Sequence, residues 1–180
     1  MDIEKFWAVI QYAHQASKGN LDKQVKLMIE TLTDLSADEI QEFDRILWTM
    51  MARVYRADLW EAVLLVACIC SDDNFHEFQG WLIAQGRTNF EKVLENPEYL
   101  ADLVDKEHRF DIFDGRVTAI GEDAYELKTN QEIPESGYPE AIILVGGPLK
   151  TEEQIRQKFP YVIAKLGECD EYEVYRLLTR

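Results

Sequence analysis

The sequence has no hydrophobic run long enough to cross a membrane. Its longest apolar run covers residues 62–70, nine positions in all, whereas a membrane-spanning helix needs roughly 20. The N-terminus has acidic residues among its first positions and no basic region followed by a long apolar one, so no signal peptide is expected. We expect the run to be a buried core segment and the protein not to associate with membranes.

Cysteine is also scarce. The chain has three, an odd number, and their positions form no framework of spacings that would predict a disulfide-rich fold. Disulfides accumulate in oxidising compartments, so this usage is typical of a reducing one. The sequence therefore predicts a cytoplasmic protein.

Basic residues are outnumbered, with 19 Lys and Arg against 34 Asp and Glu and a formal net charge of −15. Nucleic acid is therefore not an expected partner, because phosphate binding depends on Lys and Arg displacing counterions. The acidic excess is concentrated in residues 61–140, which hold 18 acidic and 6 basic side chains. Two interpretations stay open: a solvated surface that keeps the protein soluble, or an acidic face for a basic protein partner.

Hydrophobic residues are plentiful at 47%, with 11% aromatic and 29% charged residues. A chain of 180 residues with this composition suits one domain with a substantial core. No internal repeat or clear linker divides it, so residues 1–180 are expected to form a single domain. Within this domain, the secondary structure is expected to be less regular over residues 106–180.

The dominant pattern along the chain is the helical one, with apolar residues three and four positions apart. Ser36 begins a Ser-x-x-Glu capping box, Gly86 supplies a helix end, and Thr88 begins a second capping box. Pro160 must kink or divide the last helix. The chain is predicted to be all-α and compact, with helices over about 6–19, 21–32, 36–54, 58–70, 71–86, 88–96, from 97, 115–129 and from 151.

Residues 130–150 are harder to assign. Two prolines and a glycine in residues 131–139 predict a loop. The following apolar run, residues 141–145, is too short to distinguish a buried strand from part of a helix. We expect irregular or extended chain there, so the C-terminal segment is partly irregular.

Residues 70–83, CSDDNFHEFQGWLI, place a hydroxyl, two carboxylates and an imidazole close together, namely Ser71, Asp72, Asp73 and His76. In one interpretation Ser71 is an N-cap, and both Asp residues lie in the first helical turn, where negative charge interacts favourably with the helix dipole. In the other, Asp72 and His76 lie four residues apart on one helix face and form an acid/base couple or part of a metal site.

The metal interpretation has weak support in the sequence. Oxygen-rich ligands with one imidazole would suit magnesium, manganese or iron, but ferritin-like carboxylate sites need Glu-x-x-His pairs, which this chain lacks. The other imidazoles are His14, without a nearby acid, and His108, beside Glu107 and Asp111. No Gly-x-Ser-x-Gly elbow or phosphate-binding loop is present. We expect no metal and no cofactor, and whether the protein is an enzyme stays open.

Tryptophan gives a further hypothesis. Trp60 and Trp81 lie on the two predicted helices that meet at residues 70–72, and a buried indole usually needs a hydrogen-bond partner for its N–H. Asp58, Asp72 or Asp73 could accept that bond. The acidic pair would then be a structural clamp between the two helices.

An ordered set of residues resembles a bacterial family, the domain of unknown function 4240. The resemblance covers about residues 1–105 and includes Phe6-Trp7, Leu35-Ser36, residues 58–62, the spaced pattern from Cys70 to Gly86, and Asn96-Pro97. The family is uncharacterised, so the resemblance implies an all-helical fold and no reaction.

Together these observations predict an acidic protein-binding or regulatory domain of the immunity or inhibitor type. Electrostatic complementarity with a basic partner would raise the rate of association and make it sensitive to salt. The alternative is a metal-dependent or small-ligand-dependent enzyme centred on Ser71, Asp72, Asp73 and His76. The sequence does not indicate the oligomeric state.

Overall fold

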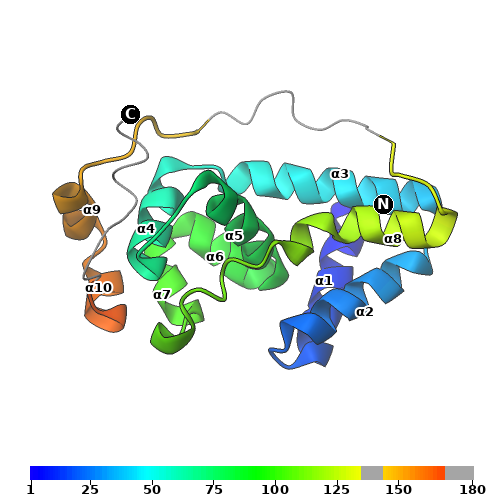
Figure 1. Cartoon of the computed structure of the whole chain (residues 1–180), viewed down its shortest axis with the longest axis horizontal. Helices are drawn as coiled ribbons and strands as arrows, with labels where there is room; N and C mark the ends of the chain where they lie inside the picture. The colour runs from blue at the N-terminus through cyan, green and yellow to red at the C-terminus, as the bar shows by residue number, and fades with distance from the viewer. Residues whose placement is uncertain (135–143, 169–180) are drawn as a thin grey trace.

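The computed structural model describes residues 1–134 and 144–168, and over these ranges the protein is all-α, as predicted (Figure 1). Three short 3-10 helices, η1, η2 and η3, connect the α-helices. The elements in chain order are α1 (Ile3–Ser17), α2 (Leu21–Thr33), α3 (Ala37–Val54), α4 (Ala57–Ala67), α5 (Asp72–Ala84), α6 (Arg87–Glu95), η1 (Pro97–Tyr99), α7 (Leu100–Leu103), η2 (Lys106–His108), η3 (Gly115–Ala119), α8 (Ile120–Thr129), α9 (Glu152–Lys158) and α10 (Pro160–Leu166).

Polar side chains begin several helices where the sequence predicted. Ser36 and Glu39 form the expected capping box at α3, in which each side chain binds the backbone N–H of the other. The predicted box at Thr88 is wrong. Gly86 is the residue before α6, and the helix begins at Arg87, so Thr88 already lies inside it.

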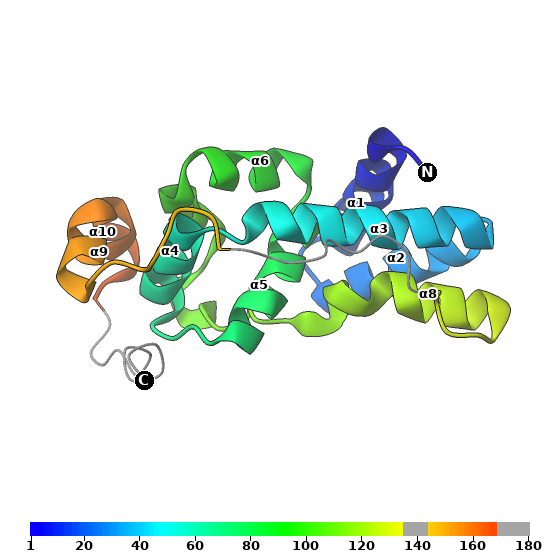
Figure 2. The same cartoon turned by 90° about the horizontal axis from the view of Figure 1, so that it is seen from above.

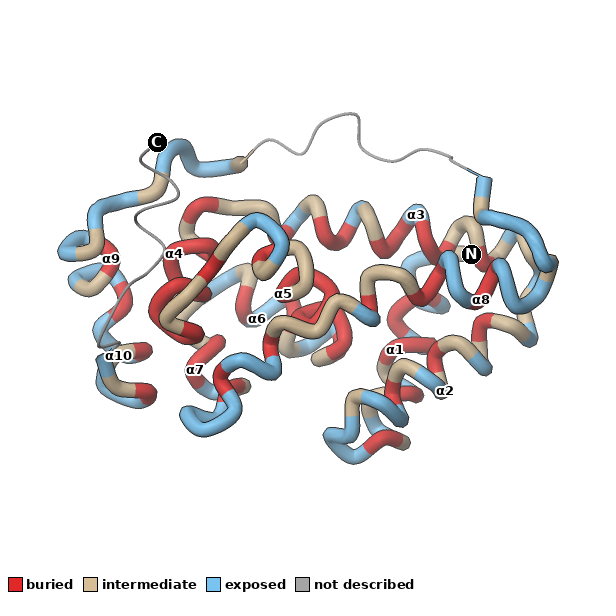
Figure 3. The backbone as a smooth tube through the Cα atoms, viewed as in Figure 1, coloured by how far each residue is buried: buried red, intermediate tan, exposed pale blue. Residues whose placement is uncertain are grey.

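Helix α4 is the centre of the fold. Nearly all of its residues are buried, as expected for the apolar run, and Figure 3 shows buried chain gathered along it. The helix ends earlier than predicted, because Cys68 adopts the left-handed conformation that terminates a helix. Among the described residues, none of the helices has the length and apolar character needed to span a membrane.

The molecule is elongated, with α9 and α10 at one end and α1, α2 and α8 at the other (Figure 1). The long helix α3 runs from the end that holds α1, α2 and α8 to α4, and α8 lies beside it in both views (Figure 2). Helix α8 also packs on α2, and η3 runs along α5.

The C-terminal segment folds back onto α4. Val145 forms an isolated parallel bridge with Arg56, and helices α9 and α10 pack against α4. Pro160 divides these two helices, as predicted. The apolar run over residues 141–145 lies mostly outside the described residues, so its assignment stays a prediction apart from the bridge at Val145.

Candidate functional site

Ser71 is an N-cap in the structure. Its Oγ accepts a hydrogen bond from the Asn74 backbone N at 3.1 Å, and the Asn74 side chain accepts one from the Ser71 backbone N at 3.3 Å. The Ser71 hydroxyl also donates to Asn74 Oδ1 at 3.0 Å. The hydroxyl is therefore engaged in both directions at the start of α5 and is poorly placed to act as a nucleophile.

Asp72 and Asp73 lie in the first turn of α5 and are exposed to solvent. The hypothesis that they clamp a tryptophan is wrong, because both carboxylates lie at the surface. Asp58 is not the acceptor either: it is paired with Arg56, at 2.5 Å. Trp60 Nε1 is buried and has no hydrogen-bond partner among the described residues.

His76 is half-buried and faces an aromatic side chain. Its ring centre lies 5.7 Å from that of Trp48, with the planes 39° apart. No group of three or more His, Cys, Asp and Glu side chains that could hold a metal ion occurs in residues 1–134 and 144–168. The structure therefore gives the proposed couple of Asp72 and His76 no further ligand.

A chain of aromatic contacts connects Trp60 with Trp81. Trp60 stacks on Phe75 with ring centres 4.3 Å apart and planes 15° apart. Phe75 contacts Phe78 at 5.5 Å, and Phe78 stacks on Trp81 at 6.0 Å. The contact between Trp60 and Phe75 therefore joins α4 to α5 through stacked rings, and not through the carboxylates.

Two buried glutamines hold helix ends, a role that the sequence did not reveal. Gln79 Nε2 on α5 donates to the Met51 carbonyl near the end of α3, at 2.7 Å. Gln24 Nε2 on α2 donates to the Ala84 carbonyl at the end of α5, at 2.6 Å. Because terminal carbonyls of a helix lack partners within the helix, these bonds position α5. The one signal in the sequence for this role is a polar residue at a position that the helical pattern assigns to the buried face of its helix.

The cysteines of the described chain are not catalytic candidates. Cys70 is free and buried, and burial, followed by the charge of Asp72, raises the pKa of its thiol well above the usual range. Thiolate formation is correspondingly disfavoured. Cys68 is disulfide-bonded, which counts against the use of cysteine content as a sign of a reducing compartment.

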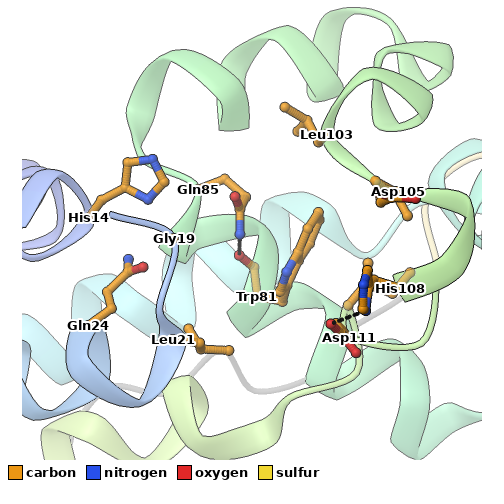
Figure 4. A pocket seen from close by; sticks show the side chains of 12 residues that line it. His14, Gly19, Leu21, Gln24, Trp81, Gln85, Leu103, Asp105, His108 and Asp111 are labelled. Carbon is orange, nitrogen blue, oxygen red and sulfur yellow. Dashed lines mark hydrogen bonds and ion pairs between the residues drawn. The ribbon is translucent and has the colours of Figure 1, made fainter. Parts of the chain in front are cut away.

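A cavity of about 260 Å³ has Trp81 in its wall. It is lined by α1, the α1–α2 turn and the start of α2, by the C-terminal end of α5, and by residues 103–112 (Figure 4). The fold brings His14 and His108 to opposite sides of this cavity, with Trp81 and Gln85 between them. His14 Nδ1 is buried without a hydrogen-bond partner among the described residues.

A wider hollow of about 480 Å³ continues from the cavity, and the two share Gly19, Leu21 and Asp111. Arg116 lies in this hollow, where its guanidinium is paired with Asp22 at 2.5 Å and with Asp114 at 2.5 Å. These hydrogen bonds raise the pKa of Arg116, the one to Asp114 most, and lower that of Asp114. The positive charge in the hollow is thus matched by two carboxylates.

Comparison with known proteins identifies a family but no function. A family model described as "Protein of unknown function (DUF4240)" matches residues 1–127, farther than the sequence resemblance to about residue 105. No curated protein and no solved structure matches the chain.

Proposed function

The chain belongs to the DUF4240 family of proteins of unknown function, and from its surface we propose that it is an acidic protein-binding or regulatory domain of the immunity or inhibitor type. Its partner would be a basic protein. The observation that carries this proposal is the distribution of unpaired charge over the described residues.

Most of the described arginines are neutralised by ion pairs. Six described arginines each pair with at least one carboxylate: Arg45, Arg53, Arg56, Arg87, Arg116 and Arg156. The acidic excess is left at the surface. Within the described chain, five exposed carboxylates on α5 and α8 form no ion pair: Asp72, Asp73, Glu122, Asp123 and Glu126. We call these five residues the acidic set.

The acidic set lies on two helices that η3 links. Helix α5 packs along η3, which continues directly into α8. The contact is close, since a Cβ atom added at Gly115 in η3 would lie 3.2 Å from Glu77 Cγ on α5. A basic surface long enough to reach both helices would meet uncompensated negative charge from each of them, which favours rapid and salt-sensitive association.

The enzyme alternative has less support from the same residues. The Ser71 hydroxyl is engaged in the cap, Asp72 and Asp73 face solvent, and His76 packs against Trp48. A nucleophile and its base need to lie within hydrogen-bond reach of each other, and the described contacts of this cluster include no such pair. Binding therefore accounts for the exposed charge better than catalysis does.

The test compares two variants with the same loss of charge. The first variant neutralises four members of the acidic set and carries Asp72→Asn, Asp73→Asn, Glu122→Gln and Asp123→Asn. The second variant neutralises four exposed acids elsewhere and carries Asp34→Asn, Asp38→Asn, Glu95→Gln and Glu107→Gln. Wild-type protein is used as bait in an extract of its source organism. Each captured protein is then purified, and its Kd is measured by calorimetry with all three baits.

The proposal expects a captured protein of net positive charge that binds more weakly as salt is raised from about 20 mM to about 300 mM. Its Kd should rise at least about tenfold for the first variant and stay within about twofold for the second. Partners that lack net positive charge, or that bind the two variants equally, would contradict the proposal.

A further inference from the structure

We propose that the cavity bounded by His14, Trp81 and His108 binds a small organic cation, that is, an amine or ammonium compound. This site goes beyond the proposed protein-binding function, because it uses residues outside the acidic set. The inference depends on the charge of the walls, the aromatic face of Trp81, the unused acceptors and the size of the space.

Among the described residues, the walls carry two carboxylates and two imidazoles but no lysine or arginine. The carboxylates are those of Asp105 and Asp111. Asp105 Oδ1 accepts a hydrogen bond from the Glu107 backbone N at 3.1 Å, and Asp111 Oδ2 lies 3.5 Å from His108 Nδ1. Both carboxylates are exposed and keep oxygen atoms available. An anion would meet repulsion here, and a cation would meet attraction.

Trp81 supplies an aromatic surface that is already held in place. Its side chain is 7% exposed, and its ring stacks on Phe78 at 6.0 Å. Figure 4 shows it between His14 and Gln24 on one side and His108 and Asp111 on the other. Tryptophan is the aromatic residue that attracts ammonium groups most strongly, and a fixed ring lowers the entropy lost on binding.

The polar groups of the cavity are suited to a ligand that donates hydrogen bonds. Gln24 and Gln85 use their NH₂ groups to bind the carbonyls of Ala84 and Trp81, at 2.6 Å and 3.3 Å. Their amide oxygens are acceptors, like the two carboxylates. Because an ammonium group has only donors, this set of acceptors favours an amine over a carboxylate or phosphate.

The size of the cavity favours a small molecule over a metal ion. A volume of about 260 Å³ is just below the range of roughly 300–1,000 Å³ that is common for ligand sites. The adjoining hollow has room for an attached chain, and Arg116 there is paired with two carboxylates. Since no metal-binding group of three side chains occurs in the described ranges, an organic cation fits the walls better.

The first experiment is calorimetric titration of the full chain with choline, putrescine and spermidine chlorides at constant ionic strength. Sodium acetate and sodium phosphate serve as anionic comparisons. We expect saturable binding of at least one cation, with one site and a Kd between about 1 µM and 1 mM, and no binding of the anions. A change in tryptophan emission should accompany it and should be lost in Trp81→Phe.

Matched variants separate a built site from general attraction of cations to an acidic protein. Asp105→Asn with Asp111→Asn should weaken binding by at least about tenfold. Asp34→Asn with Asp38→Asn removes the same charge from exposed positions at the junction of α2 and α3 and should change the Kd by less than about twofold. Absence of cation binding up to about 10 mM, equal effects of the two variants, or equal binding of the anions would overturn the proposal. The protein-binding proposal would be untouched, because it depends on the acidic set and not on Asp105 or Asp111.

Discussion

Lys158 Nζ on α9 lies 2.6 Å from Glu61 Oε2 on α4, and the Glu61 side chain is only 1% exposed. The other oxygen, Oε1, accepts a hydrogen bond from the Lys150 backbone N at 2.9 Å. Glu61 therefore ties residues 150–158 to the central helix. These residues follow the part of the chain that the family model matches, which ends at residue 127. A buried carboxylate thus connects the family-matched part of the chain to the segment beyond it.

Replacement of Lys158 should destabilise the protein, because it leaves the buried carboxylate of Glu61 without its cation. We expect Lys158→Ala to lower the free energy of unfolding by about 1–3 kcal/mol, measured by urea denaturation. Lys165→Ala is the control, since its partner Asp102 is far more exposed than Glu61 and exposed ion pairs contribute little to stability. Equal losses in the two variants would contradict the role assigned to Glu61.

The approach of α8 to α3 should make Gly121 intolerant of a side chain. A Cβ atom there would lie 2.7 Å from the Cβ of Asp44, and Asp44 is 2% exposed. Gly121→Ala should therefore cost about 1–3 kcal/mol of unfolding free energy, although alanine is the better helix former. Gly115→Ala, which would meet the flexible Glu77 side chain, should cost less. Thermal melts of both variants test this, and a stabilised Gly121→Ala protein would contradict it.

The start of α5 should behave as a cap. Ser71→Ala should lose about 1 kcal/mol, a fall in Tm of about 2–4 °C for a domain of this size. Asp72→Asn and Asp73→Asn should each lose about 0.3–1 kcal/mol, because their charges lie beside the helix N-terminus. Divalent metals should leave every melt unchanged. A higher Tm in either Asp variant, or a metal effect confined to the wild type, would instead favour the metal-dependent or small-ligand-dependent enzyme, since functional residues commonly strain the fold.

Acid should weaken the connection between α1 and α3. The pKa of Glu39 is lowered from its usual 4.5 to about 2, first by the hydrogen bond from Lys5 and then by bonds from Ser36. A carboxyl with a depressed pKa in the folded state stabilises that state above its unfolded pKa, and the contribution is lost as the pH falls. The stability of the wild type relative to Glu39→Gln should be constant above about pH 5 and decline between about pH 4.5 and 2. A difference independent of pH would refute this assignment.

Much of the fold could be predicted because helix boundaries depend on neighbouring residues. Ser36, Ser71 and Thr151 each begin a helix through a bond to the residue three positions later, and Pro160 divides the last two helices because it cannot sit inside one. The same local chemistry made Ser71 identifiable as a cap. The prediction of a capping box at Thr88 was wrong because Gly86 already occupies the N-cap position, so that the helix begins at Arg87.

Contacts between helices could not be read from the sequence. Trp60 was expected to bind a nearby carboxylate, but Phe75 stacks on it across the α4–α5 interface. His14 and His108 are far apart along the chain and had no visible connection, yet they line one cavity.

The sequence by itself therefore determined the helical class, most helix starts and ends and the acidic character of this protein, because these follow from residues a few positions apart or from composition. Only the tertiary structure decided that Asp72 and Asp73 face water, that Glu61 is buried against Lys158, and that Trp81 lies between two imidazoles. Those outcomes depend on the directions in which the packed helices point their side chains. These directions depend on how all the helices pack together in the core.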